Sequence, residues 1–353
     1  MLHTLKIQNF RRFRDFELSS LGRINLLVGK NNTGKTSILE AVQLLYSVKD
    51  PAEPLSEIML GRGEYSWGAS GEGQCLDIRH LFSDHEIQVG SRFSILGVHE
   101  NQEEKLVATL EADELEKLVF SMLWRYGKDC EEAKWIRELS EGVCLPIRLL
   151  RLSFRKTKSN KVSTKFLKSS SWSSAKMLEL FNQVVLTAKE ETVYEALQAI
   201  EPRLERIASV ADLRETRWNS REGFAVRLVG SAERLPIGSL GDGFWRMLGL
   251  SLAAVGVAEG ILLVDEIDTG LHFNTLSDMW RLLWETAKRL DIQIFATTHS
   301  SDCWQSLARL ANQEDTQQYG GISIHRIERD RPTGIVFREA EMAIAAEHEI
   351  EVR

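Results

Sequence analysis

One eight-residue run constrains the fold of this chain more than any other feature of its sequence. The sequence GKNNTGKT at residues 29–36 matches the pattern GxxxxGK[ST] at every fixed position. The apolar run at residues 24–28 precedes it and is typical of a buried strand, and a helical pattern follows over residues 35–47. A loop of this composition between a strand and a helix predicts a phosphate-binding site.

The residue types of the loop indicate which ligand it binds. Gly29 and Gly34 allow the backbone to turn so that its N–H groups point at phosphate oxygens. Lys35 is expected to reach the β- and γ-phosphates, and Thr36 is expected to supply a hydroxyl to Mg²⁺. The loop therefore predicts ATP and Mg²⁺ as cofactors.

An acidic pair follows a second buried strand far along the chain. Four apolar residues, 261–264, end in Asp265 and Glu266. Asp265 is expected to hold Mg²⁺ through its water shell, and Glu266 is expected to orient or deprotonate the attacking water. Together with the phosphate loop, this pair predicts hydrolysis of the bound nucleotide.

The order of apolar patterns predicts the fold class. Strands expected at 261–264 and 292–296 alternate with expected helices, which indicates a mainly parallel α/β sheet. The pattern at 111–139 favours a helix, 145–154 a strand, and 173–205 one or two helices. We expect three parts: 1–110 with the phosphate loop and an antiparallel β subdomain, 111–205 as a helical arm, and 206–353 with the acidic pair.

Composition narrows the class of protein. Hydrophobic residues at 43% and charged residues at 27% exclude wholesale disorder, and the net charge of −7 argues against a surface that wraps nucleic acid uniformly. The four cysteines have no CxxC spacing, which favours a reducing compartment and no zinc site. The apolar stretch 247–264 is interrupted by Glu259 and Gly260, so we expect a soluble, cytoplasmic protein without a membrane segment.

One segment has a charge unlike the rest. Residues 142–178 contain nine basic and no acidic side chains, which leaves −16 for the remainder of the chain. The segment is either a contact for DNA or RNA, with Trp172 available for stacking, or a solvated loop. The candidate contact residues are Arg155, Lys156, Lys158, Lys161, Lys165 and Lys168.

Further motifs follow the order found in one ATPase superfamily. They are IQNFRRF at 7–13, SLGD at 239–242, DTGLH at 268–272 and IFATTHS at 294–300. The chain resembles the ABC-type ATPase heads of the RecF, SMC and OLD kind, and within them the small stand-alone OLD-like AAA15/AAA21 group. Asp242 stands where the signature motif of these heads usually has Glu or Gln, and we assign no Gln loop.

The resemblance implies a role for several residues outside the phosphate loop. It implies that Arg11 reaches the bound phosphates, that Ser239 contacts the γ-phosphate held by an opposite subunit, that Asp268 lies in the D-loop, and that His299 senses the γ-phosphate. The implied catalytic residues are Glu266, His299 and Lys35, and the implied Mg²⁺ ligands are Thr36 and Asp265. The implied ATP contacts are Arg11, Gly29, Asn31, Asn32, Thr33, Gly34, Lys35, Thr36, Ser37, Ser239, Gly241 and Asp268.

The resemblance also implies partners. Two heads are expected to stack head to tail as a homodimer around two ATP molecules. The 54 residues after His299 are too few for the Toprim nuclease domain of full-length OLD proteins, so we expect a separate effector, a nuclease or a toxin. The expected role is a switch in anti-phage defence or nucleic-acid maintenance. The alternatives are a scaffold ATPase that binds only protein and a transporter ATPase, and a GTPase is disfavoured because NKVS at 160–163 lacks the Asp of NKxD.

Overall fold

The chain forms two compact units. The computed structural model describes residues 1–67, 73–100, 102–126, 131–140, 143–150, 162–170, 172–210, 223–231, 233–313, 316–348 and 350–352. The first unit comprises Met1–Gly22, Lys30–Val162 and His325–Val336, and the second comprises Arg23–Gly29, Ser163–Ile324 and Phe337–Arg353. The phosphate loop therefore leaves the second unit at Gly29 and enters the first at Lys30.

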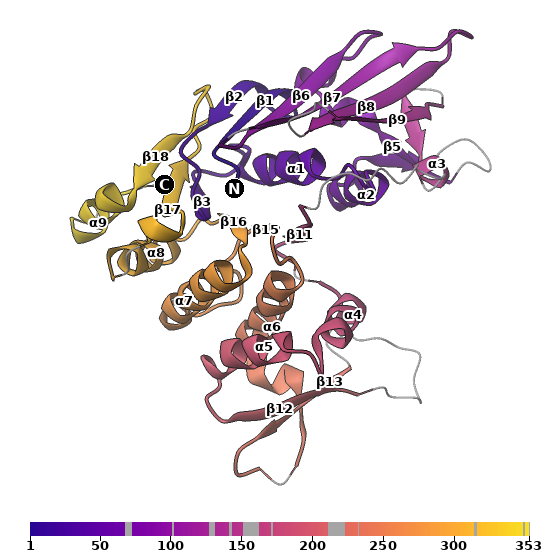
Figure 1. Ribbon diagram of the computed structural model, residues 1–353. Helices are drawn as coiled ribbons and strands as arrows, with labels where there is room; N and C mark the ends of the chain where they lie inside the picture. The colour runs from indigo at the N-terminus through magenta and orange to yellow at the C-terminus, as the bar shows by residue number, and fades with distance from the viewer. Residues whose placement is uncertain are drawn as a thin grey trace. The chain divides into compact units, whose positions relative to one another are not determined.

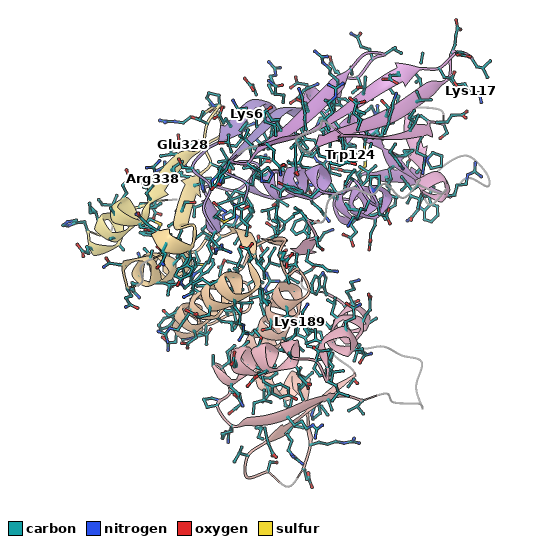
Figure 2. The ribbon with its side chains drawn as sticks, viewed as in Figure 1. Lys6, Lys117, Trp124, Lys189, Glu328 and Arg338 are labelled. Atoms are coloured by element: carbon teal, nitrogen blue, oxygen red, sulfur yellow. A yellow bond between two sulfur atoms is a disulfide. The ribbon has the colours of Figure 1, made fainter. Side chains whose placement is uncertain are left out.

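The first unit contains an antiparallel sheet with the strand order β2-β1-β6-β7-β8-β9. Helices α1 (Lys35–Leu45) and α2 (Ala52–Gly61) lie along one face of this unit (Figure 1). Trp124, labelled in Figure 2, is buried and donates its indole N–H to the Leu44 carbonyl, 3.2 Å away. The strands are β1 Thr4–Phe10, β2 Phe13–Leu18, β6 Arg92–Val98, β7 Glu103–Ala112, β8 Leu118–Tyr126 and β9 Glu131–Glu138.

The helix expected over 111–139 is wrong, because this stretch forms the end of β7 and the strands β8 and β9. Apolar residues recur there at helical spacing, but Phe120, Met122 and Trp124 also alternate with period two and bury one face of the sheet. Asp113 accepts the N–H groups of Leu115 and Lys117, which closes the hairpin between β7 and β8. Lys117 lies at the tip of this hairpin (Figure 2).

A small second sheet of the first unit has the order β10-β5-β4 and contains a disulfide. Its strands are β4 Tyr65–Trp67, β5 Gln74–Asp77 and β10 Cys144–Pro146. Cys75 and Cys144 are bonded across β5 and β10, with their Cα atoms 5.6 Å apart. The sequence did not predict this pair, because it depends on a strand pairing that cysteine spacing does not indicate. The strand expected over 145–154 ends at Pro146, where the short helix α3 (Ile147–Leu150) begins.

The second unit is built on the expected parallel sheet. Strands β11, β15, β16 and β3 are parallel neighbours in the order β11-β15-β16-β3-β17-β18. Their apolar side chains are buried on both faces, as an α/β sheet requires. The strands of this sheet are β3 Ile24–Val28, β11 Thr164–Leu167, β15 Ile261–Val264, β16 Gln293–Thr297, β17 Ile322–Arg326 and β18 Ile335–Arg338. The chain passes into the first unit at His325, within β17, and returns to the second at Phe337, within β18.

Helices and one smaller sheet complete the second unit (Figure 1). Helices follow β15 and β16 as the alternation predicted, and the region 173–205 contains two helices that end before Pro202. The smaller sheet consists of β12 Leu204–Ser209, β13 Phe224–Leu228 and β14 Leu235–Pro236. The helices are α4 Ser174–Val184, α5 Lys189–Gln198, α6 Gly241–Val255, α7 Phe273–Leu290, α8 Ser301–Gln313 and α9 Glu339–Glu347.

One feature of this fold positions the site. The parallel register places the carboxyl ends of β15, β16 and β3 on one edge of the second unit's sheet. Ligands of open α/β sheets bind beyond this edge.

Among the helices in the described ranges, none combines the length and apolar character needed to cross a membrane.

Candidate functional site

The phosphate loop turns sharply into helix α1. Gly34 has a φ of 99°, and a Cβ there would lie 2.7 Å from Cδ of Arg12 and against the ring of Phe13. Only glycine fits this position. The loop is held from within, because the Thr33 hydroxyl donates to the Lys30 carbonyl at 3.0 Å and Lys35 Nζ donates to the same carbonyl at 2.8 Å.

The start of α1 has the properties of an anion site. The helix begins at Lys35, and its N-cap residue Gly34 has no side chain that could cap it. The first N–H groups of a helix and its dipole both favour a bound phosphate. Lys35 is buried, and Thr36 beside it is half-buried. The expected loop residues Asn31, Asn32 and Thr33 precede this turn, and Ser37 follows within the helix.

Arg12, and not Arg11, contacts the phosphate loop. One Arg12 nitrogen donates to the Asn32 carbonyl, and the other donates to the Arg329 carbonyl at 3.1 Å. Burial lowers the pKa of Arg12, and the positive charge of Arg329 lowers it further. The negative charge of Asp330 partly offsets this, and a phosphate bound at the loop would favour the charged form of Arg12 in the same way. Sequence reasoning did not assign this residue.

Arg11 is buried, and its guanidinium is paired with side chains of the first unit, so its implied contact with the bound phosphates stays a prediction. Its guanidinium lies 3.2 Å from Glu40 and 2.5 Å from Glu64, and it donates to the His80 carbonyl at 2.9 Å. The positive φ of 56° at Arg11 marks the turn between β1 and β2. Two adjacent arginines in a turn point to different places, and the motif alone did not distinguish them.

Glu40 joins this buried network from helix α1. Arg62 Nε approaches it at 2.7 Å, so two arginines flank one carboxylate. Burial raises the pKa of Glu40, and the charges of Arg11 and Arg62 only partly offset this. The network fixes α1, and with it the end of the phosphate loop, to the rest of the first unit.

The acidic pair in the second unit is organised by one threonine of β16. The Thr297 hydroxyl donates to Asp265 Oδ1 at 2.7 Å, and it accepts the N–H of Glu266 at 2.8 Å. Glu266 has a φ of 47°, which turns the chain directly after Asp265. Thr269 donates to the carboxylate of Glu266 at 3.3 Å. The two carboxylates are therefore held in defined directions at the end of β15.

Thr298 fixes the direction of Asp268 in the D-loop, as Thr297 fixes that of Asp265. The Thr298 hydroxyl donates to Asp268 Oδ1 at 2.6 Å, and the Thr298 N–H donates to the Leu27 carbonyl at 3.2 Å. The second contact places the end of β16 beside the end of β3, which leads into Gly29. His299 follows and is half-buried at this edge. The sequence predicted His299 but gave no role to Thr297 or Thr298.

The signature residues lie at the start of α6. Ser239 is exposed in the turn Ile237–Leu240, and Gly241 has a φ of 84° as the helix begins. A Cβ on Gly243 would lie 3.2 Å from the Gly270 carbonyl. The signature turn and the D-loop are thus neighbours within the second unit.

The basic segment is described only in part. Arg155, Lys156, Lys158 and Lys161 lie outside the described residues, whereas Lys165 belongs to β11 and Lys168 follows that strand. Trp172 is half-buried against the core and donates its indole N–H to the Phe166 carbonyl at 3.2 Å. Part of its ring therefore packs against the core, and stacking on a base stays a prediction for the part that is exposed.

This geometry defines a class. A phosphate loop between a strand of a parallel sheet and a helix start, together with an acidic pair at the end of another strand of that sheet, characterises P-loop ATPases. The chain belongs to the AAA_15 family of AAA ATPase domains, whose model matches residues 1–200. A second model, AAA_21, is an AAA domain linked by its description to the AbiEii toxin of a Type IV TA system, and it matches residues 151–302.

Individual relatives match the chain over very different lengths. A Methanocaldococcus jannaschii protein named "Uncharacterized protein MJECL10" is 40% identical over 97 residues, 26% of this chain and 42% of that protein. An "ATP/GTP phosphatase" of Helicobacter pylori is 21% identical over 345 residues, 89% of this chain and 90% of its own. The "DNA replication and repair protein RecF" of Rickettsia massiliae is 44% identical over 45 residues, 13% of this chain and 12% of RecF. The chain thus spans less than half of the first relative.

Solved structures resemble the chain more distantly. The SMC head domain from Thermotoga maritima has a TM-score of 0.42 at 13% identity, covering 96% of this chain and 98% of that one. A Pyrococcus furiosus Smc head bound to the C-terminal domain of ScpA has a TM-score of 0.46 at 12% identity, covering 99% of both chains. Scores of this size support no assignment by themselves.

Proposed function

We propose that this protein is a molecular switch that binds and hydrolyses ATP. The observation that carries the proposal is the threonine pair of β16, which fixes Asp265, Glu266 and Asp268 at the sheet edge where β3 leads into the phosphate loop. Membership of a family of AAA ATPase domains supports the same activity. The backbone N–H groups of the loop and Lys35 would bind the phosphates of ATP.

The residues also suit Mg²⁺. This ion prefers oxygen ligands and usually takes one or two from the protein, with water and nucleotide phosphates filling the rest. Thr36 would provide a hydroxyl and Asp265 a carboxylate, whose direction is set by Thr297. Bound Mg²⁺ would neutralise charge that develops on the phosphates. Glu266 would accept a proton from the attacking water, and His299 would contact the γ-phosphate.

A second copy of the chain would complete each site. The start of α6, with Ser239 exposed and the D-loop beside it, has N–H groups suited to a γ-phosphate. In the proposed homodimer, Ser239, Gly241 and Asp268 of one copy would face ATP bound by the other. ATP would close this dimer and hydrolysis would loosen it, which is how a nucleotide switches shape.

The switch would control a separate effector, a nuclease or a toxin, in anti-phage defence or nucleic-acid maintenance. The toxin–antitoxin link of the AAA_21 model and the RecF relatives support this setting. The alternative is a scaffold ATPase that sequesters a protein without touching nucleic acid, and the packing of Trp172 favours it over stacking on bases. A transporter ATPase is the less favoured alternative. A pull-down of bound partners, made before and after nuclease treatment, distinguishes the switch that contacts nucleic acid from the scaffold that binds only protein.

Phosphate release from ATP tests the proposed activity. The wild-type protein should release phosphate with Mg²⁺, and Lys35→Ala should abolish release because the phosphates lose their cation. Lys117→Ala, an exposed position at the tip of the hairpin between β7 and β8, is the control and should keep the wild-type rate. Equal rates for wild type and Lys35→Ala, or no release by the wild type, would contradict the proposal.

A further inference from the structure

A buried arginine on α6 contacts the backbone of the acidic pair. Arg246 is 2% exposed. One of its terminal nitrogens donates to the Asp265 and Glu266 carbonyls, both at 2.9 Å, and the other donates to the Lys168 carbonyl at 2.8 Å. Three main-chain acceptors that directly follow β15 and β11 therefore converge on one guanidinium in the second unit.

Burying a cation in this way is costly, so its contacts must compensate. Burial lowers the pKa of Arg246 to about 10, while the carboxylates of Asp265, Asp268 and Glu266 raise it. The guanidinium is therefore charged near neutral pH, and its charge is stabilised by the carboxylates of the proposed ATPase site. A planar group with fixed donors orients its acceptors more strictly than a flexible ammonium does.

The hydrogen bonds of Arg246 lie at the backbone turn that sets the direction of the Glu266 side chain. Glu266 has a left-handed φ of 47°, and Arg246 holds the carbonyls on both sides of that turn. Thr297 holds its N–H. Arg246 and Thr297 thus both hold the backbone turn from which the Glu266 side chain leaves the chain.

We propose that Arg246 is a positioning residue for ATP hydrolysis. It orients Glu266, and it links the orientation of Glu266 to helix α6, which starts at the signature turn. This inference rests on the proposed function. Arg246 lies in the second turn of α6, which begins at Gly241. A partner or nucleotide that shifts the start of α6 would thereby move the acidic pair.

Arg23 provides a matched control in the same unit. Its guanidinium also binds main-chain carbonyls, those of Ala287 at 2.9 Å, Ile292 at 3.3 Å and Tyr319. It precedes β3, at the opposite end of the parallel strands from the acidic pair. Arg23→Ala should therefore lower thermal stability without changing the turnover of ATP.

The test measures kcat and KM for ATP together with thermal unfolding. Arg246→Ala should lower kcat about 100-fold, because a displaced catalytic group of this kind costs about that much. It should change KM by less than about threefold, because the ground-state phosphate contacts remain. Arg246→Lys should recover about tenfold of the lost kcat, since the charge returns without the planar donors. If Arg246→Ala does not fold, Arg246→Lys carries the test with the same KM criterion.

A double-mutant cycle separates positioning from a merely structural role. In the Glu266→Gln background, Arg246→Ala should lower the residual rate less than about threefold, because residues that act as a unit are not additive. An equal loss in both backgrounds, a loss shared by Arg23→Ala, or an unchanged kcat in folded Arg246→Ala would overturn the inference while the wild type still hydrolyses ATP. A wild type without ATPase activity would overturn the proposed function, and this inference with it.

Discussion

The hydroxyl of Thr297 donates a 2.7 Å hydrogen bond to Oδ1 of Asp265. The same hydroxyl accepts the N–H of Glu266, so one side chain from β16 holds both members of the acidic pair on β15. The two strands are parallel neighbours, and Thr297 is the last residue of its strand. A hydroxyl at this place can set the direction of a metal-binding carboxylate without binding the metal.

Replacing Thr297 by Val removes the hydroxyl at nearly constant volume. We expect the Mg²⁺ concentration for half-maximal ATPase rate to rise about tenfold, the lower end of losses for such outer ligands. Thr297→Ser keeps the donor and should stay near the wild type. A Mg²⁺ titration of phosphate release measures both, and identical shifts for Val and Ser would contradict the role of the hydroxyl.

Substitution of Arg12 should weaken ATP binding, whereas substitution of the adjacent Arg11 should lower the stability of the fold. Arg12→Ala should raise KM for ATP about tenfold, or about 1.4 kcal/mol, because the phosphate loop loses a neighbouring cation. Arg11→Ala should lower the free energy of unfolding by about 3–5 kcal/mol, because Glu40 and Glu64 lose a buried partner. Steady-state kinetics and denaturant unfolding compare the two variants. The reverse pattern would favour Arg11 as the phosphate contact.

His325 should make stability fall in acid. It is fully buried, and burial lowers its pKa from 6.5 to about 4. Because the unfolded chain binds a proton more readily, the contribution is complete above pH 6.5 and is lost as the pH falls towards 4. The slope attributable to this residue is at most about 1.4 kcal/mol per pH unit.

His325→Gln cannot titrate and should flatten this slope. Denaturant unfolding of both proteins between pH 4 and 7 measures the difference, and the other titrating groups are common to both. Equal slopes for the two proteins would show that His325 titrates alike in the folded and unfolded states.

The disulfide between Cys75 and Cys144 closes a loop with a sequence separation of 69. In the chain-entropy account, a loop of this length stabilises the fold by about 4 kcal/mol. Dithiothreitol should therefore lower the Tm of the wild type but not that of a Cys75→Ser, Cys144→Ser variant. Peptide mapping without reductant identifies the bond. If the oxidised protein contains both residues as thiols, the pairing does not form in solution.

Short sequence patterns predicted the strands, helices and loop whose conformation depends mainly on neighbouring residues in the chain. The strand at 261–264 and its alternation with helices were expected from short apolar runs and their breaks, and both are confirmed. The phosphate loop was expected because its glycine positions and helix start lie within eight residues. These features need no knowledge of distant partners.

Other features depend on neighbours that the sequence does not reveal. The stretch 118–126 fits both a helical and an alternating pattern, and only pairing with β7 and β9 decides for a strand. Arg11 and Arg12 differ through the backbone of one turn, and the cysteine pair depends on β5 meeting β10. Thr297 is an ordinary strand residue until β15 lies beside it.

The Glu266→Gln variant tests the central claim most directly. Mixed with ATP and Mg²⁺ and passed through size-exclusion chromatography with light scattering, it should elute as a dimer that retains ATP. Its turnover should be at least about 100-fold below the wild type, because general-base catalysis is lost while the phosphate contacts remain. The same variant without nucleotide should show the mass of the wild-type protein without nucleotide. A Glu266→Gln protein that hydrolyses ATP at the wild-type rate, or that has the same mass with and without ATP, would contradict an ATP-driven switch.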